Sequence, residues 1–286
     1  MADTDMQMRP LRDDMSFGLL VETGRKASTI GRDTVNQLRS QLRRHRLLVL
    51  RGFDTGFDST PEFVAHARAW GEIMSWPFGD VLDAVVHENP IDSVFDCSYL
   101  PLHWDGMYRD TIPEIQLFYC VHAPDSEAGG HTIFVDTVSL LQDTDHALLT
   151  AWSKASITCR VKKASHYGGE VHSPLIVPHP VTGERTLRYN EPVEDPLFLN
   201  PHTVLMDQLS DEHRQKLHEM LSLPRYRYAH AWKPGDIIIA DNFALLHGRA
   251  AFDRLTPRHL RRIHIHASPI HINSALRFEA DIVESR

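Results

Sequence analysis

The spacing of apolar residues in the first quarter of the chain predicts two helices with a strand between them. Residues 33–45 carry apolar side chains three and four positions apart, which is the period of an amphipathic helix. The continuous apolar run of 47–53 is typical of a buried strand. A second helix is expected from Ser59, a suitable N-cap residue, to Gly71. The polar stretch up to about Thr29 is expected to be irregular.

Beyond about Pro101 the pattern changes to short runs of β-branched and aromatic residues bounded by turn residues. The predicted strands cover residues 114–121, 131–136, 236–241 and 261–267. Two helices are predicted between them, over 138–155 and over 211–221, the latter with Ser210 as its N-cap. Because helices and strands do not alternate regularly, a sandwich or jelly roll fits better than a parallel α/β sheet. We therefore predict a mainly β fold with flanking helices, arranged as a jelly roll.

Composition limits the classes of protein that remain. The formal net charge is −8, from 30 Lys+Arg against 38 Asp+Glu, and no basic stripe is interleaved with aromatic residues, which argues against a nucleic-acid partner. Three cysteines without a CxxC pair argue against a disulfide framework and a thiolate zinc site. No apolar run approaches the roughly 20 residues of a membrane span. With no secretion signal and no linker or repeat, we expect one cytoplasmic domain over residues 1–286.

Two of the 19 histidines have a spacing that suits metal binding. His103 and Asp105 are two residues apart, so on a strand both side chains would point to one face. His247, which follows the predicted strand 236–241, is the best candidate for a third ligand. Two histidines and a carboxylate with further positions open form the facial triad of non-haem Fe(II) oxygenases. The His103–Asp105 pair alone would more often be a buried histidine hydrogen-bonded to a structural aspartate.

Four motifs in order resemble the taurine dioxygenase-like (TauD/TfdA) family of Fe(II)/2-oxoglutarate oxygenases. They are HWD (103–105), GGHT (129–132), the GD…ADN…LHGR run (235–249) and RHLRR (258–262). The resemblance implies a double-stranded β-helix and an oxidoreductase, a dioxygenase that uses Fe(II), 2-oxoglutarate and O2. By the same resemblance, His103, Asp105 and His247 are the iron ligands and the catalytic centre.

The resemblance also implies two places where carboxylates bind. Arg258 corresponds to the residue that binds the far carboxylate of 2-oxoglutarate, and Thr132 to a hydrogen-bonding partner of the same group. Arg262 corresponds to a residue that often meets an acidic substrate. A planar, always-charged guanidinium suits a carboxylate better than a lysine does. In isolation, the same RHLRR segment would predict a solvated basic edge strand.

A narrower resemblance covers nearly the whole chain and points to isonitrile-processing oxygenases of the paerucumarin type. It is carried by residues 75–82, 101–134, 239–252 and 258–267. Such enzymes of secondary metabolism act as desaturases on the isonitrile of an aromatic amino acid, usually tyrosine. They install a Cα–Cβ double bond, with or without loss of the carboxylate. The resemblance leaves open which of the two products this chain makes.

Several residues near the motifs are candidates for contact with an aromatic substrate, namely Tyr99, Met107, Tyr108 and His166. Trp104 is expected in the core, because it would face away from the two neighbouring ligands on an alternating strand. His264, His266 and His271 form a cluster near the C-terminus, and the first two are expected to be hydrogen-bonded imidazoles rather than metal ligands.

Two alternative functions remain open. The same motifs would serve a hydroxylase of a sulfonate or an aryloxy acid, which differs from a desaturase in the mass of its product. A jelly-roll binding module could instead keep His103 and His247 as structural residues, binding no Fe(II) and consuming no 2-oxoglutarate. The expected partner is a small molecule, and a homo-oligomer is left open.

Overall fold

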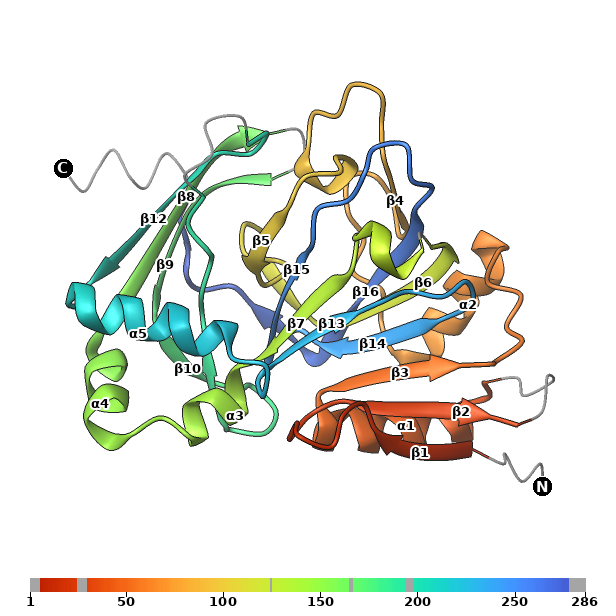
Figure 1. Cartoon of the computed structure of the whole chain (residues 1–286), viewed down its shortest axis with the longest axis horizontal. Helices are drawn as coiled ribbons and strands as arrows, with labels where there is room; N and C mark the ends of the chain where they lie inside the picture. The colour runs from red at the N-terminus through yellow and green to blue at the C-terminus, as the bar shows by residue number, and fades with distance from the viewer. Residues whose placement is uncertain (1–5, 25–29, 124, 165–166, 194–197, 278–286) are drawn as a thin grey trace.

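The computed structural model describes residues 6–24, 30–123, 125–164, 167–193 and 198–277. Its largest layer is a seven-stranded sheet (Figure 1). In spatial order the strands are β1 (Met6–Pro10), β2 (Leu19–Thr23), β3 (Leu47–Arg51), β14 (Ile237–Asp241), β6 (Thr111–His122), β16 (His259–Ile272) and β4 (Leu82–Val85). All neighbouring pairs are antiparallel except β2 and β3, which run parallel.

A four-stranded antiparallel sheet packs against one face of this layer. It consists of β13 (Arg227–His230), β7 (Thr132–Asp136), β15 (Leu245–Arg249) and β5 (Leu100–His103). Phe118 and Ile238 of the large sheet share a buried apolar cluster with Phe134 and Leu245 of the small one. Two sheets with a common core, antiparallel apart from the β2–β3 pair, form the jelly roll, so the predicted fold class is confirmed.

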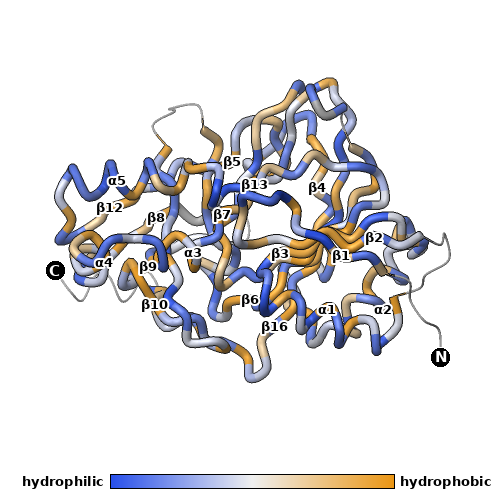
Figure 2. Tube along the Cα trace, turned by 60° about the horizontal axis from the view of Figure 1, so that its bottom comes forward, coloured by the Kyte–Doolittle hydropathy of each residue, from blue (hydrophilic) through white to orange (hydrophobic). Residues whose placement is uncertain are grey.

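Two helices cover the opposite face of the large sheet, α1 (Arg32–His45) and α2 (Thr60–Trp70). Ile237 and Ile239 pack in the cluster beneath these helices, whereas Ile238 points into the jelly-roll core. This alternation explains the continuous apolar run of β14, because a strand covered on both faces has no polar side. Figure 2 shows the result as hydrophobic tube along β3 and the strands beside it.

A second four-stranded sheet stands beside the jelly roll and is partly covered by helices (Figure 1). Its strands are β12 (His202–Asp207), β8 (Ser156–Ala164), β9 (Tyr167–Pro174) and β17 (Leu276–Arg277). The remaining elements are α3 (Thr137–Gln142), α4 (His146–Lys154), α5 (Asp211–Ser222), the strand pair β10 (Ile176–Pro178) and β11 (Arg185–Leu187), and two short 3-10 helices, Ser93–Phe95 and Ser126–Ala128. No helix in these described ranges is long and apolar enough to cross a membrane.

Two predictions about local structure are wrong. The opening stretch contains β1 and β2, because the half-apolar β2 gains a parallel partner in β3 that local sequence cannot reveal. The helix predicted over 138–155 is two helices. Asp145 is the N-cap of the second of these helices. Its side chain accepts hydrogen bonds from the backbone N–H groups of Ala147 and Leu148, so a new helix begins here.

Candidate metal centre

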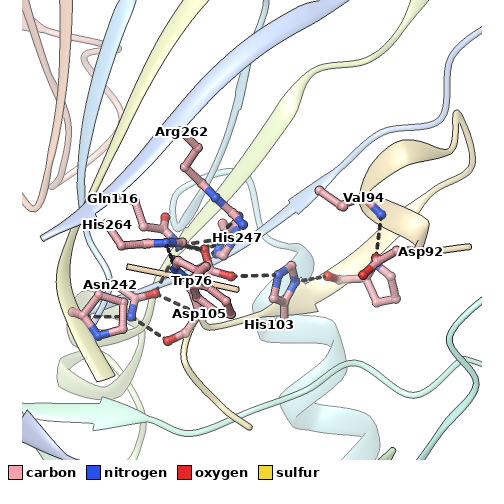
Figure 3. A network of polar contacts seen from close by, with 12 residues as sticks. Trp76, Asp92, Val94, His103, Asp105, Gln116, Asn242, His247, Arg262 and His264 are labelled. Atoms are coloured by element: carbon pink, nitrogen blue, oxygen red, sulfur yellow. Dashed lines mark hydrogen bonds and ion pairs between the residues drawn. The ribbon is translucent and has the colours of Figure 1, made fainter. Parts of the chain in front are cut away.

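Three side chains meet at the inner end of the small sheet (Figure 3). His247 lies in the middle of β15, and its backbone pairs with His103, the last residue of β5. Asp105 follows β5 in a turn rather than on the strand, so the predicted same-strand geometry is wrong although the pair still converges. Asp105 Oδ1 is 3.7 Å from His103 Nε2, and Asp105 Oδ2 is 3.5 Å from His247 Nε2.

The two imidazoles present nitrogen atoms suited to a metal. His103 Nδ1 lies 2.8 Å from the carbonyl oxygen of Pro101, and donation there leaves Nε2 free to act as a ligand. Burial, reinforced by the neighbouring His103, lowers the pKa of His247 well below its usual value, so this ring is neutral. His247 can therefore offer a lone pair to a metal at neutral pH.

Asp105 is buried and remains ionised. Burial by itself would raise its pKa, but the positive charge of Arg262, together with the nearby imidazoles of His247 and His264, outweighs it and holds the pKa well below the usual range. Its Oδ2 accepts from three donors: Gln116 Nε2 at 2.6 Å, His264 Nε2 at 2.7 Å and Arg262 Nη1 at 2.8 Å. Oδ1 is thus the carboxylate oxygen left to face His103.

The turn that carries Asp105 is fixed by Asn242, a residue to which the sequence interpretation gave no role. Its side-chain oxygen accepts from the backbone N–H of Asp105, and its amide nitrogen donates to the carbonyls of Asp105 and Pro113. Gln116 was also missed, although it hydrogen-bonds Asp105 and Asn242. Asn242 belongs to the ADN motif, which could have indicated its role in the site, whereas nothing in the sequence around Gln116 indicates that it contacts Asp105.

The donor set fits a divalent transition metal. The ligand atoms of His103, Asp105 and His247 lie within 4.8 Å of one another, and in the described part of the chain this is the one such group of three His, Cys, Asp or Glu residues. Ligand atoms about 2.1 Å from a shared metal lie roughly 3–4 Å apart, close to the separations found here. Two imidazoles and one carboxylate leave further coordination positions, as in facial-triad iron sites.

The buried guanidinium of Arg258 lies close to the triad of His103, Asp105 and His247. Arg258 donates from Nε to the Gly130 carbonyl at 3.0 Å, and its Nη2 is 3.4 Å from Thr132 Oγ1. Burial lowers the pKa of Arg258 to about 9, so the guanidinium is protonated at neutral pH. Among the described residues, no carboxylate pairs with it. A buried charge without a counter-ion is costly, so the site suits an anionic ligand.

The surroundings of Arg258 favour a carboxylate. Thr132 Oγ1 accepts from Trp232 Nε1 at 2.9 Å, which leaves its hydroxyl proton available to a ligand. Gly130 has φ +72, and a Cβ there would lie 3.1 Å from Arg258 Cδ, so the GGHT glycine permits the close approach. Phe134 pairs with His247 across the β7–β15 ladder, which puts Thr132 two residues, or about 7 Å, along the strand.

A cavity opens beside the triad, and some of the predicted substrate-binding residues line it. Met107, Tyr108 and Arg262 line it together with His103 and Asp105. Its aromatic wall is formed by Trp76, Phe78, Trp104 and Phe198, and its polar lining includes Asp92, Arg109, Asn190, Asn200 and His202. Arg258 and Thr132 are not among the described residues that line this cavity.

Of the three other candidates, Tyr99 lies outside the cavity lining, Arg262 has a second role, and His166 is not described by the structure. Tyr99 donates to Glu191 Oε2 at 2.7 Å and is absent from the described cavity lining. His166 lies outside the described residues. Arg262 lines the cavity but is also ion-paired with Asp105, so it contacts the triad carboxylate as well as facing the cavity.

Comparisons with known proteins agree with this geometry. The family model for taurine catabolism dioxygenase TauD, TfdA family, matches residues 9–264. A tyrosine isonitrile desaturase of Pseudomonas aeruginosa is 41% identical over 279 residues, which cover 94% of this chain and 95% of the relative. A 3-((Z)-2-isocyanoethenyl)-1H-indole synthase of Fischerella ambigua is 40% identical over 254 residues, covering 87% and 92%.

A solved structure extends the likeness to three dimensions. PvcB, described as an Fe, alpha-ketoglutarate dependent oxygenase from an isonitrile synthetic pathway, has a TM-score of 0.78 at 38% identity and covers 97% of both chains. The family resemblance carried by the four motifs is thereby confirmed, and the chain belongs to the TauD/TfdA family of dioxygenases.

Proposed function

We propose that this protein is an Fe(II)- and 2-oxoglutarate-dependent oxygenase that desaturates the isonitrile of an aromatic amino acid. The observation that carries the proposal is the convergence of His103, Asp105 and His247 beside the buried, unpaired cation of Arg258. Bound Fe(II), together with 2-oxoglutarate and O2, supplies the oxidising power for removing hydrogen from the substrate carbon. The protein contributes binding, orientation and the exclusion of water.

The residues divide these tasks. His103, Asp105 and His247 hold the iron, and the three donors on Asp105 Oδ2 keep that carboxylate ionised and oriented. Arg258 and Thr132 bind the far carboxylate of 2-oxoglutarate, since the guanidinium has no carboxylate partner in the described part of the chain and the hydroxyl has a proton to donate. The substrate occupies the cavity beside the triad.

The lining of the cavity supports an aromatic, anionic substrate. Trp76, Phe78 and Tyr108 provide ring faces, and Arg262 and Arg109 provide positive charge for a carboxylate. Two similar proteins are named for products or substrates that combine an isonitrile with an aromatic ring, one phenolic and one indolic. Met107 and Tyr108, in the turn after the ligands, are the residues we assign to contact with the ring.

The test is metal-dependent turnover of tyrosine isonitrile. Asp105→Ala removes one of three ligands and should abolish both succinate formation and product, whereas Asp207→Ala, an exposed position on β12, should behave as wild type. Succinate formation that survives Asp105→Ala would contradict the triad assignment. Product mass separates the two reactions, because desaturation removes two hydrogens and hydroxylation adds one oxygen.

We also propose a cytoplasmic location and a single functional unit over residues 1–286. Cys97, Cys120 and Cys159 are all free thiols, which suits a reducing compartment. Burial raises the pKa of Cys120 and Cys159 to about 12, so both thiols are unreactive, as expected of core cysteines.

A further inference from the structure

Trp76 lines the substrate cavity and is connected to the metal-binding carboxylate through a single side chain (Figure 3). Its indole Nε1 donates to His264 Nδ1 at 2.8 Å. On the other side of the imidazole, His264 Nε2 lies 2.7 Å from Asp105 Oδ2. The three side chains therefore form a continuous hydrogen-bonded chain from the cavity wall to the triad.

The chemistry of the indole determines the direction of these hydrogen bonds. An indole N–H can only donate, so His264 Nδ1 must be an acceptor and carries no proton. A neutral imidazole then has its proton on Nε2, where it donates to Asp105 Oδ2. In the other tautomer, a nitrogen lone pair would face the carboxylate and repel it.

Trp76 is itself held firmly in place. Ile73 forms a β-bridge with Ile265, and the backbone N–H of Met74 donates to the carbonyl of His264, so this segment lies along β16. Trp76 and Gly79 exchange backbone hydrogen bonds of 3.1 and 2.8 Å. The backbone that carries the indole is thus held in place without the bond from Trp76 Nε1 to His264.

Side chains also fix the plane of the indole ring. Phe78 stacks on it with ring centroids 5.7 Å apart and an interplanar angle of 10°. The Arg109 guanidinium lies 5.2 Å from the ring centroid, within the range of a cation–π contact. An indole held in this way can impose one tautomer on His264.

We propose that Trp76 is a positioning residue for the metal ligand Asp105. It acts through His264, whose tautomer it fixes, so that Oδ2 is held by a donor and Oδ1 stays directed toward the metal position. The inference rests on the proposed function, because it assumes that Asp105 binds a metal. Partners that orient a first ligand typically change metal affinity 10–100-fold.

The experiment measures Mn(II) affinity of the full chain from the electron paramagnetic resonance signal of free Mn(II). Trp76→Phe keeps an aromatic ring but removes the N–H donor, and it should raise the Kd for Mn(II) at least tenfold. Trp70→Phe is the matched control, since Trp70 makes the same kind of bond, from Nε1 to His66 Nε2 at 2.9 Å, within α2. Its Kd should stay within twofold of wild type.

A double-mutant comparison separates positioning from simple packing. His264→Gln places an amide donor near the former Nε2 and should retain more affinity than His264→Leu. Because Trp76 acts through His264, adding Trp76→Phe to His264→Gln should produce no further loss. Thermal unfolding of each variant checks folding, and the Gln and Leu pair still tests the donor to Asp105 if Trp76→Phe does not fold.

The outcomes distinguish this inference from the proposed function. If wild type binds Mn(II), Asp105→Ala does not, and Trp76→Phe binds as wild type does, the positioning role is wrong while the metal site stands. Losses that multiply in the Trp76→Phe/His264→Gln double variant would also overturn it. Failure of wild type to bind Mn(II) would refute the proposed function and this inference together.

Discussion

At the residue scale, the chemistry of the site depends on which oxygen or nitrogen each side chain leaves available. His103 gives Nδ1 to a backbone carbonyl and keeps Nε2, and Asp105 gives Oδ2 to three donors and keeps Oδ1. These assignments leave His103 Nε2 and Asp105 Oδ1 directed at a common position beside His247. The ligand set is therefore oriented by its hydrogen-bond partners, and their loss should change metal affinity before it changes the fold.

Arg258 provides a second test at this scale. Its buried charge has no carboxylate partner among the described residues, so it costs stability that a bound dicarboxylate restores. With Mn(II) in place of iron, 2-oxoglutarate at about 100 times its Kd should stabilise wild type by about 2.7 kcal/mol, seen as a rise in Tm. Arg258→Met should lose this rise without a lower Tm in the unliganded state.

The comparison for Arg258→Met is Arg44→Met, an exposed arginine of α1, which should keep the full response to 2-oxoglutarate. A normal rise in Tm for Arg258→Met would mean that the co-substrate carboxylate binds elsewhere. A large fall in its unliganded Tm would mean that the guanidinium is already well satisfied by Gly130 and Thr132.

The sequence predicted the residues of the site better than their partners. His103 and Asp105 could be found because they are only two residues apart in the sequence. His247 could be found because it follows a clearly predicted strand. Gln116 could not, since a glutamine inside an apolar strand has no pattern that shows what it contacts across the sheet. Trp76 was missed for the same reason, because its bond spans 188 positions.

At the scale of elements, most helices and strands were predictable from periodicity and caps. Ser210 caps α5 by accepting from the backbone N–H of His213, as predicted. The failures are β1 and β2. β2 pairs with β3, which follows α1 in the sequence, and β1 pairs with β2. In β1 and β2, pairing with strands in the folded protein outweighs the local propensity of the residues. A single sequence cannot show such pairing.

One ion pair joins elements that are far apart in sequence. Arg46, directly after α1 with φ 63, contacts Asp136 at the end of β7 at 2.8 Å, and Asp136 is fully buried. Breaking a buried pair leaves an uncompensated charge and typically costs about 3–5 kcal/mol. Arg46→Met should lower the free energy of unfolding by this amount in urea titrations, whereas Arg12→Met, which breaks the exposed pair with Asp14, should cost less than about 1 kcal/mol.

The same pair has a pH dependence with a definite sign. Burial, opposed by Arg46, raises the pKa of Asp136 above its usual 3.8. A carboxyl with a raised folded-state pKa binds protons more readily when folded, so stability falls as the pH rises above 3.8. Without Arg46 the pKa rises further, and the deficit of Arg46→Met should be larger at pH 7 than at pH 5. An equal deficit at both pH values would contradict this account.

At the scale of the whole molecule, the cavity is shared between the jelly roll and the second four-stranded sheet. The jelly roll supplies His103 and Arg262, whereas Val161 comes from β8 and His202 from β12. The three proposed metal ligands, and Arg258 as the proposed partner of the co-substrate carboxylate, all belong to the jelly-roll side. Binding of metal and co-substrate should therefore be separable from selection of the substrate.

Val161→Phe tests this separation, because Val161 is buried against the cavity from the second sheet and a phenyl ring there would occupy space that the substrate needs. We expect the KM for the isonitrile substrate to rise at least tenfold while Mn(II) affinity and the Tm response to 2-oxoglutarate stay as in wild type. Leu205→Phe, at a position 48% exposed on the same sheet, should change none of the three. Equal losses of metal, co-substrate and substrate binding in Val161→Phe would show instead that the two sheets form a single energetic unit around the site, since a steric block confined to the cavity cannot reach Arg258.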